Sequence, residues 1–228
     1  RSTLFPYTTL FRSNYLTTFN LSHNTNKVVN LDGDQTEIVS GTQIHKIGHS
    51  YRTFYMIEFA GINPENGNPQ FYKNDLLEDG SYNKEITEKA SEAKSIMLDK
   101  HAEPNVTGGL YNSFRYKWFD LSFLFNYQFG GWSYDTWAQK TEHGGYDMEA
   151  NIPTYYADSW KKPGDVTKYE QFYEKSSRVA MHKITNSRRL HSTDFLRLKT
   201  FTLGFTLPKQ WLSFVGLSNA RIYMSANN

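Results

Sequence analysis

One segment, residues 118–131, constrains the fold of this chain more than any other. Its odd positions from 119 to 129 are aromatic or aliphatic, whereas its even positions from 120 to 128 are polar except for Leu124. Successive side chains of a β-strand point to opposite faces, so the segment predicts a strand with one apolar and one polar face. The alternation continues for about 9–11 residues, the length of a tilted strand that crosses a bilayer in a barrel. The first prediction is an all-β fold, a partial antiparallel transmembrane β-barrel with long extracellular loops.

Composition removes several other classes of protein. No apolar run approaches the roughly 18 residues of a membrane helix, and the mean hydropathy is −0.66. The formal net charge of +2 does not predict a nucleic-acid partner. The 228 residues include no cysteine, which excludes disulfides and thiolate metal sites. An aromatic content of 16% suits the interfacial belts of a barrel, or a surface on which sugars stack.

The amino-terminal residues resemble something other than natural protein. Residues 2–13 match an in-frame translation of a common sequencing-library adapter. Such segments are set aside before a fold is inferred. We therefore expect residues 1–13 to be an adapter-derived artefact and residues 14–228 to be one incomplete barrel domain, an interior piece of a longer reading frame.

Further alternating segments predict more strands. They cover residues 15–22, 51–59 (the weakest), 107–116, 200–207 and 220–226. The connections near Lys117 and over 208–217 are short, whereas those over 61–106 and 131–192 are long. Short turns on one side of the membrane and long loops on the other are typical of outer-membrane barrels. The join over 24–50 is too long for a short turn, unless residues 28–31 and 37–40 form a strand pair of their own. Ala90, Ala93 and Met97 have helical spacing and predict a helix over 84–100.

Four phrases in the chain then point to a family. They are residues 59–69, which include Asn63-Pro64-Glu65-Asn66-Gly67, the hairpin over 107–122, the loop phrase over 158–165, and residues 194–208. In this order they resemble the carboxy-terminal barrel region of SusC/RagA-type TonB-dependent outer-membrane transporters. The resemblance implies a barrel of about 22 strands that imports oligosaccharides or peptides through the bacterial outer membrane. It also implies a SusD-like surface lipoprotein as partner, outer-membrane lipid around the wall, and a TonB complex that acts through a region upstream of this chain.

Strand parity assigns candidate residues to each face of the wall. The polar face would line the lumen of the barrel, and the apolar face would contact lipid. The predicted lumen-facing residues are Asp120, Ser122, Asn126, Gln128, Thr200, Thr202 and Thr206. The predicted lipid-facing residues are Phe119, Leu121, Phe123, Phe125, Phe129, Phe201, Leu203 and Phe205.

Aromatic residues in the long loop are the candidates for contact with a solute. Trp137, Tyr155, Tyr156 and Trp160 lie among polar residues, where flat rings suit sugar stacking as well as an interfacial belt. For Trp132 and Tyr134, next to a strand end, the belt is the prediction.

Basic residues near the strand over 200–207 suggest a contact with phosphate. Arg188, Arg189, Arg197 and Lys199 precede its apolar band, and Arg197 and Lys199 share the parity of Phe201. The hypothesis is a contact with lipid headgroups or lipopolysaccharide; a solvated basic surface is the simpler alternative.

No catalytic or metal site is predicted, and no cofactor is expected. His45 and His49 have the spacing of zinc ligands on a helix, but Gly48 disfavours that helix. The preferred function is transport. The alternatives are a soluble carbohydrate-binding β-sandwich and, less favoured, a secreted glycoside hydrolase fragment. The isolated segment is not expected to fold stably, because an open sheet leaves backbone groups unpaired at both edges.

Overall fold

The computed structural model of the chain describes residues 13–147, 149–173 and 183–228. The adapter-like residues 1–12 lie outside this described part, and Ser13 is the first residue of a strand. The chain divides into two compact units. The wall unit contains residues 13–24, 104–130 and 193–228, and the loop unit contains residues 25–103 and 131–192. No helix of the described residues is long and apolar enough to cross a membrane.

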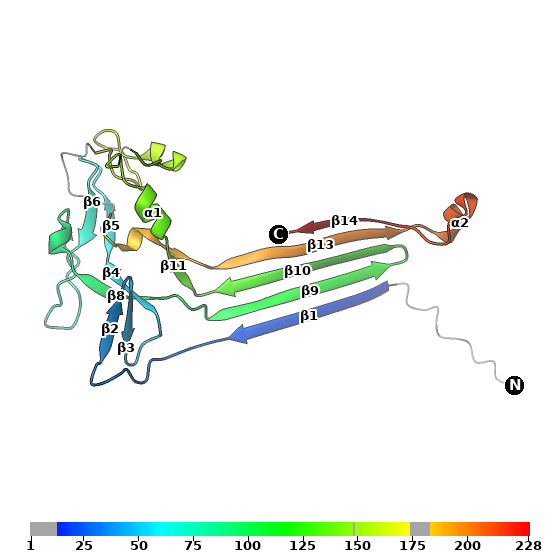
Figure 1. Cartoon of the computed structure of the whole chain (residues 1–228), viewed down its shortest axis with the longest axis horizontal. Coiled ribbons are helices and arrows are strands. Elements are labelled where there is room, and N and C mark those ends of the chain that lie inside the picture. Colours follow the sequence, from blue (N-terminus) through cyan, green and yellow to red (C-terminus); the bar gives the residue numbers. More distant parts are fainter. Residues whose placement is uncertain (1–12, 148, 174–182) are drawn as a thin grey trace. The chain divides into compact units, whose positions relative to one another are not determined.

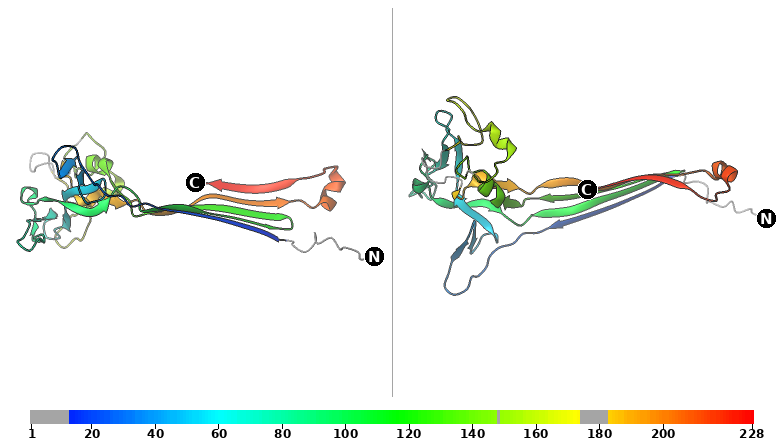
Figure 2. Two further views of the ribbon diagram at one scale, coloured as in Figure 1. Left: turned by 90° about the horizontal axis from the view of Figure 1, so that it is seen from below. Right: turned by 45° about the horizontal axis from the view of Figure 1, so that its top comes forward.

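The wall unit is one open antiparallel sheet of five strands (Figure 1). In spatial order these are β1 (Ser13–His23), β9 (Val106–Tyr116), β10 (Phe119–Phe129), β13 (Phe195–Thr206) and β14 (Arg221–Asn227). The strands form a single layer when seen from two further directions (Figure 2). The outer edges of β1 and β14 have no strand partner among the described residues. The sheet has the architecture that the sequence predicted for part of a β-barrel wall, and the described residues do not close it into a barrel.

Short and long connections are segregated to opposite ends of the wall sheet. A tight turn joins β9 to β10, with Lys117 in the left-handed conformation at φ 51°. The β13–β14 connection at the same end holds α2 (Lys209–Leu212) and η6 (Ser213–Val215). At the other end His23 pairs with Val106, and Gln128 pairs with Phe195. Residues 24–105 and 130–194 are therefore two insertions that leave and re-enter the sheet at one end.

The strand predicted over residues 51–59 is not part of the wall sheet. Its absence from the wall explains why the join over 24–50 is too long for a short turn. Residues 51–59 do not join the wall, because β1 pairs directly with β9. They contribute instead to small sheets of the loop unit, as β4 (Thr53–Ile57) and the start of β5 (Phe59–Ile62). The join over 24–50 is consequently part of a long insertion and not an overlong turn. Residues 28–31 form no strand, and β2 (Glu37–Ser40) pairs with β3 (Gln43–Lys46).

The loop unit consists of three small antiparallel sheets and short helices. One sheet has the order β2-β3-β4-β8, another β5-β6-β7, and the third pairs β11 with β12. The remaining bounds are β6 (Pro69–Tyr72), β7 (Ile86–Thr87), β8 (Ser95–His101), β11 (Trp132–Tyr134), β12 (Leu190–Ser192), η2 (Ala90–Glu92), α1 (Thr136–Thr141), η3 (Thr154–Asp158) and η5 (Ser187–Arg189).

The helix predicted over 84–100 is wrong. The segment contains β7, the single turn η2 and β8. Ile96 pairs with Met56 of β4, and this cross-strand contact outweighs the helical spacing of the alanines. Local spacing over so few apolar residues does not distinguish a helix from a buried strand.

The loop unit has its own apolar core. Phe54, Met56 and Leu190 are buried together, and Leu98, Ala102, Trp132 and Tyr134 pack against them. The Lys100 ammonium lies 4.0 Å from the centroid of the Trp132 ring. Trp132 and Tyr134 thus pack against this core while staying partly exposed, and the interfacial belt predicted for them stays a prediction.

Candidate functional site: the two faces of the wall sheet and the loop cluster

The apolar face of the wall sheet contains every predicted lipid-facing residue. Directly opposite residues of an antiparallel pair project to the same face. Phe119 lies opposite Phe205, Leu121 opposite Leu203, and Phe123 opposite Phe201. The same rows continue across the sheet into Tyr15, Phe19, Leu110, Phe114, Ile222 and Met224.

This face has no protein cover in the wall unit. Tyr15 is 67% exposed, Phe19 62% and Ile222 66%. Exposed apolar patches of soluble monomers rarely exceed a few hundred Å², and larger ones mark interaction or membrane surfaces. A soluble sandwich would bury this stripe as its core, so the continuous exposed face disfavours that alternative.

A β-bulge in β13 corrects the predicted position of Arg197. The pairing with β10 shifts register between Leu124 and Phe125, and Lys199 is the extra residue. A bulge reverses the parity of the residues beyond it. Arg197 therefore lies opposite Asn126 on the polar face, not on the face of Phe201. Leu196 and Leu198 take its place on the apolar face, opposite Tyr127 and Phe125.

The polar face brings the predicted lumen-facing residues together. Ser122 lies opposite Thr202, and Thr200, Thr206, Asn126, Gln128 and Asp120 share this face. Asp120 forms an ion pair with Arg221 of β14, with Nε 3.1 Å from Oδ1. The pair passes over Gly204, where an added Cβ would lie 2.5 Å from the guanidinium. Gly204 thus allows a charge contact across the intervening strand.

Two details of the apolar face were not anticipated from the sequence. Asn112 has the parity of this face but is buried, and it accepts a hydrogen bond from the Tyr15 hydroxyl at 2.5 Å. Tyr127 lies across Gly108 and donates to the Asn20 carbonyl at 2.8 Å. A Cβ at Gly108 would approach the Tyr127 hydroxyl to 2.3 Å. Both arrangements give a hydrogen-bond partner to a polar group on the apolar face.

In the loop unit, two of the family-like phrases contact each other. Trp160 packs on Gly67, where a Cβ would lie 2.5 Å from its ring, and its Nε1 donates to the Pro64 carbonyl at 2.8 Å. Glu88 accepts hydrogen bonds from the side-chain amides of three asparagines, Asn63, Asn66 and Asn68. We call Glu88, the three asparagines and Trp160 the asparagine clasp. Glu88 and the asparagines lie in the first long insertion, and Trp160 of the second insertion contacts the same turn at Pro64 and Gly67.

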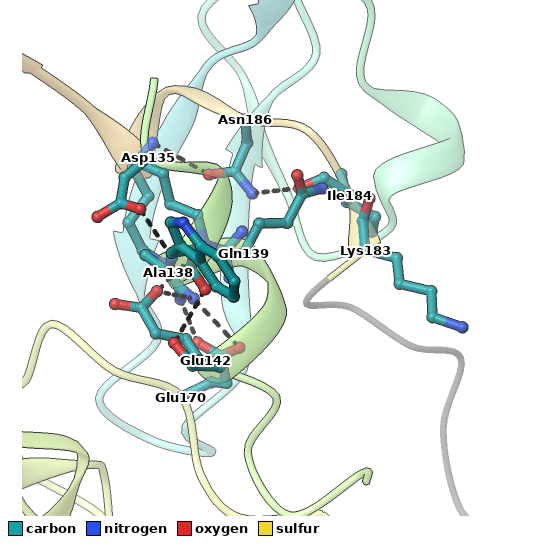
Figure 3. A network of polar contacts seen from close by, with 12 residues as sticks. Asp135, Ala138, Gln139, Glu142, Glu170, Lys183, Ile184 and Asn186 are labelled. Carbon is teal, nitrogen blue, oxygen red and sulfur yellow. Dashed lines mark hydrogen bonds and ion pairs between the residues drawn. The ribbon is translucent and has the colours of Figure 1, made fainter. Parts of the chain in front are cut away.

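A buried ion network holds the second insertion together (Figure 3). Glu142 accepts from Nε of Arg189 at 3.1 Å and from Nη2 of Arg188 at 3.3 Å. Glu170 accepts from Arg188. Two carboxylates thus balance two guanidiniums, and the side chain of Arg189 is only 1% exposed. Both Nη atoms of Arg189 are buried without a hydrogen-bond partner among the described residues.

The network overturns one hypothesis and identifies residues missed by sequence reasoning. Arg188 and Arg189 are neither a solvated basic surface nor free for lipid phosphates, because they are buried against glutamates. Glu142 and Glu170 carry no local signal in the sequence. Their partners lie up to 47 positions away, so only the folded chain brings them together.

The four loop aromatics have different environments. Trp137 is 73% exposed, whereas Tyr156 is fully buried in the loop unit. The Tyr155 hydroxyl donates to Glu142 at 3.2 Å. Burial, and then the Glu142 carboxylate, raise the pKa of Tyr155 to about 12. Trp160 belongs to the asparagine clasp, so Trp137 and the exposed edge of Tyr155 remain the accessible members of the set.

A separate polar hollow lies in the loop unit. It has a volume of about 410 Å³ and is lined by residues that include His49, Thr53, Asp99 and His101. None of the four predicted loop aromatics lines it. Among the described residues, no group of three or more His, Asp or Glu side chains is placed to hold a metal ion.

Comparison with known proteins agrees with this arrangement. The chain is 27% identical over 230 residues to TonB-dependent receptor P3 of Formosa agariphila, and 25% identical over 255 residues to receptor P39 of the same organism. These alignments cover 93% and 95% of the chain. The chain is similar to TonB-dependent receptors over most of its length. It spans only 22% and 24% of the two receptors' lengths.

Solved structures lead to the same relationship. The RagAB peptide transporter superposes with a TM-score of 0.73 at 26% identity, over 95% of this chain and 23% of that chain. The RagAB peptide importer in its "closed-closed" state gives a TM-score of 0.72, also at 26% identity. The resemblance to the SusC/RagA type is thereby confirmed. No family model matches the chain.

Proposed function

We propose that this chain forms part of the wall and outer loops of a TonB-dependent nutrient transporter in the bacterial outer membrane. The single observation that carries the proposal is the two-faced wall sheet. Its apolar face is continuous over five strands and uncovered, while its other face is polar. Because backbone polar groups must be paired inside a bilayer, a sheet of this kind reaches stability by closing into a barrel. The segment would therefore act within a larger barrel and contribute no chemical reaction.

In this arrangement each face has a separate role. The lipid-facing set surrounds Phe123, and the lumen-facing set surrounds Ser122 on the opposite side of the same strand. The asparagine clasp and the ion network would stabilise the long insertions, which would serve as the outer loops. Trp137 and Tyr155 would then present flat rings to an incoming solute.

The solute is a peptide or an oligosaccharide. The structures that this chain resembles are described as a peptide importer, which supports peptides as the first class to test. The exposed Trp137 ring suits either class, since both sugars and peptide side chains stack on indole. The partners would be a SusD-like surface lipoprotein over the loops and the TonB complex on the other side of the membrane.

Uptake by cells tests the proposal. The complete reading frame that contains this chain would be expressed with its neighbouring lipoprotein gene in a host that lacks its own uptake system. We expect the protein in the outer-membrane fraction, and uptake of labelled peptides or oligosaccharides that disappears when tonB is deleted. A protein recovered from the soluble fraction, or uptake that persists without TonB, would contradict the proposal.

A further inference from the structure

The β13–β14 connection contains large apolar residues that are not part of the strands of the wall sheet. Among its described residues, three large apolar side chains are exposed: Trp211 by 60%, Phe214 by 96% and Leu217 by 54%. Leu212 is 4% exposed and supplies the inner side of the helical turn. Gly216, in the left-handed conformation at φ 72°, ends the η6 turn after Ser213 and Phe214. A short segment that buries one leucine and exposes a tryptophan, a phenylalanine and a second leucine has an outer side without a partner.

This outer side continues the apolar face of the wall. The Trp211 ring lies 6.3 Å from the ring of Phe205, which in turn lies 4.8 Å from Phe119. A groove of about 250 Å³ next to these rings is lined by Leu203, Ile222 and Met224 as well as by Phe119 and Phe205. The exposed residues of the connection therefore extend one apolar surface beyond the last pair of the ladder, Thr206 with Arg221.

The length of the apolar stripe gives the depth of the connection. The ten steps from Phe119 to Phe129 cover about 33 Å at roughly 3.3 Å per residue. A tilt of about 40° reduces this length to about 25 Å along the membrane normal, which is the height of the apolar band of such barrels. Phe119 and Phe205 then lie at one boundary of the hydrocarbon, so α2 and η6 lie in the headgroup layer just outside it.

We propose that the α2–η6 connection is an interfacial membrane anchor whose occupant is the lipid headgroup and upper acyl layer at the short-turn end of the barrel. The inference rests on the proposed function, since it requires the apolar face to contact lipid. Trp211 and Phe214 place rings at the level where aromatic residues partition most favourably. Lys209 is exposed in the same turn, and a lysine at this level can extend its ammonium to lipid phosphates. Short amphipathic segments bind this layer through buried apolar area and attraction to anionic lipid.

Spin labels provide the test, because this chain has no cysteine of its own. The complete protein would be reconstituted in phosphatidylethanolamine–phosphatidylglycerol bilayers with a label at one of three sites: Phe214→Cys, Gln210→Cys or Phe123→Cys. Collision with oxygen reports hydrocarbon, and collision with a water-soluble nickel chelate reports water. We expect Phe123→Cys deep in the hydrocarbon, Phe214→Cys at headgroup depth with loss of nickel collisions, and Gln210→Cys accessible to nickel.

The three labels separate failure of the anchor from failure of the wall. If Phe123→Cys is deep but Phe214→Cys collides with nickel as strongly as Gln210→Cys, the anchor is refuted and the wall assignment stands. If Phe214→Cys is shielded from oxygen and nickel alike, a protein covers it, and the lipid assignment is equally refuted. If Phe123→Cys is itself in water, the proposed function fails first.

Discussion

The two units of this chain differ in the exposure of their large apolar side chains and of their ion pairs. In the wall unit large apolar residues such as Phe19 and Ile222 are exposed, and the ion pair of Asp120 with Arg221 stands on an open surface. In the loop unit Phe54 and Met56 are buried, as is Arg189 with its glutamate. The loop unit is organised like a small protein in water, with its core inside. The wall sheet has no core of its own, because most of its large apolar side chains project to one face of a single layer.

This contrast indicates which surroundings stabilise each unit. Burial of apolar area contributes roughly 25 cal/mol per Å², but only if the area leaves water. In the loop unit, apolar surface is removed from water because apolar side chains pack against one another. The wall sheet requires lipid on one face and strand partners at both edges. Single substitutions should therefore destabilise each unit for a different physical reason.

The largest effect is expected in the loop unit from Glu142→Ala. The substitution leaves the buried Arg189 guanidinium without its carboxylate, and breaking a buried ion pair costs roughly 3–5 kcal/mol. We expect faster hydrogen exchange in α1 and around Glu170, with no change in the wall strands. Glu149→Ala is the matched control, since Glu149 is an exposed glutamate of the same insertion. Equal exchange in the two variants would show that the network does not stabilise the loop unit.

A slightly smaller effect is expected in the wall from Phe123→Arg. A charge at the lipid-facing midplane of a barrel costs about 2–4 kcal/mol. The variant should assemble poorly in the outer membrane and lose heat-modifiable mobility in gels. Ser122→Arg, one residue away on the polar face, should assemble normally. If both variants assemble equally well, the two faces do not differ in their surroundings.

Much of the wall could be predicted from sequence, because a two-residue period is a local property. The faces around Phe123 and Ser122 follow from parity alone. Arg197 could not be placed, because the bulge at Lys199 depends on pairing with another strand. The loop unit was harder for the same reason. The spacing of Ala90, Ala93 and Met97 predicted a helix that does not form. The sequence around Arg189 does not indicate which buried glutamate it contacts.

A moderate effect in the loop unit should follow from Gly67→Ala. The new Cβ would meet the Trp160 ring at 2.5 Å, and overpacking of this kind costs about 1–3 kcal/mol. Gly164→Ala is a close control: its φ of +93° is also left-handed, but no atom lies within 4 Å of the added Cβ. Denaturant unfolding should separate the clash from the backbone strain that both variants share. Equal losses of stability would mean that Trp160 does not restrict this turn.

The smallest effect tests the wall through Tyr127→Phe. This change removes only the hydrogen bond from the Tyr127 hydroxyl to the Asn20 carbonyl, worth about 0.5–1.5 kcal/mol. Tyr127→Leu also removes the ring that covers Gly108, so it should destabilise the sheet more. Unfolding in detergent micelles would measure both losses. If the two variants lose the same amount, the hydroxyl alone stabilises the β1–β9–β10 region. A larger loss of stability for the leucine variant would mean that the Tyr127 ring fills the space left by the missing side chain of Gly108. Part of the packing of the apolar face would then come from the protein's own side chains and not from lipid.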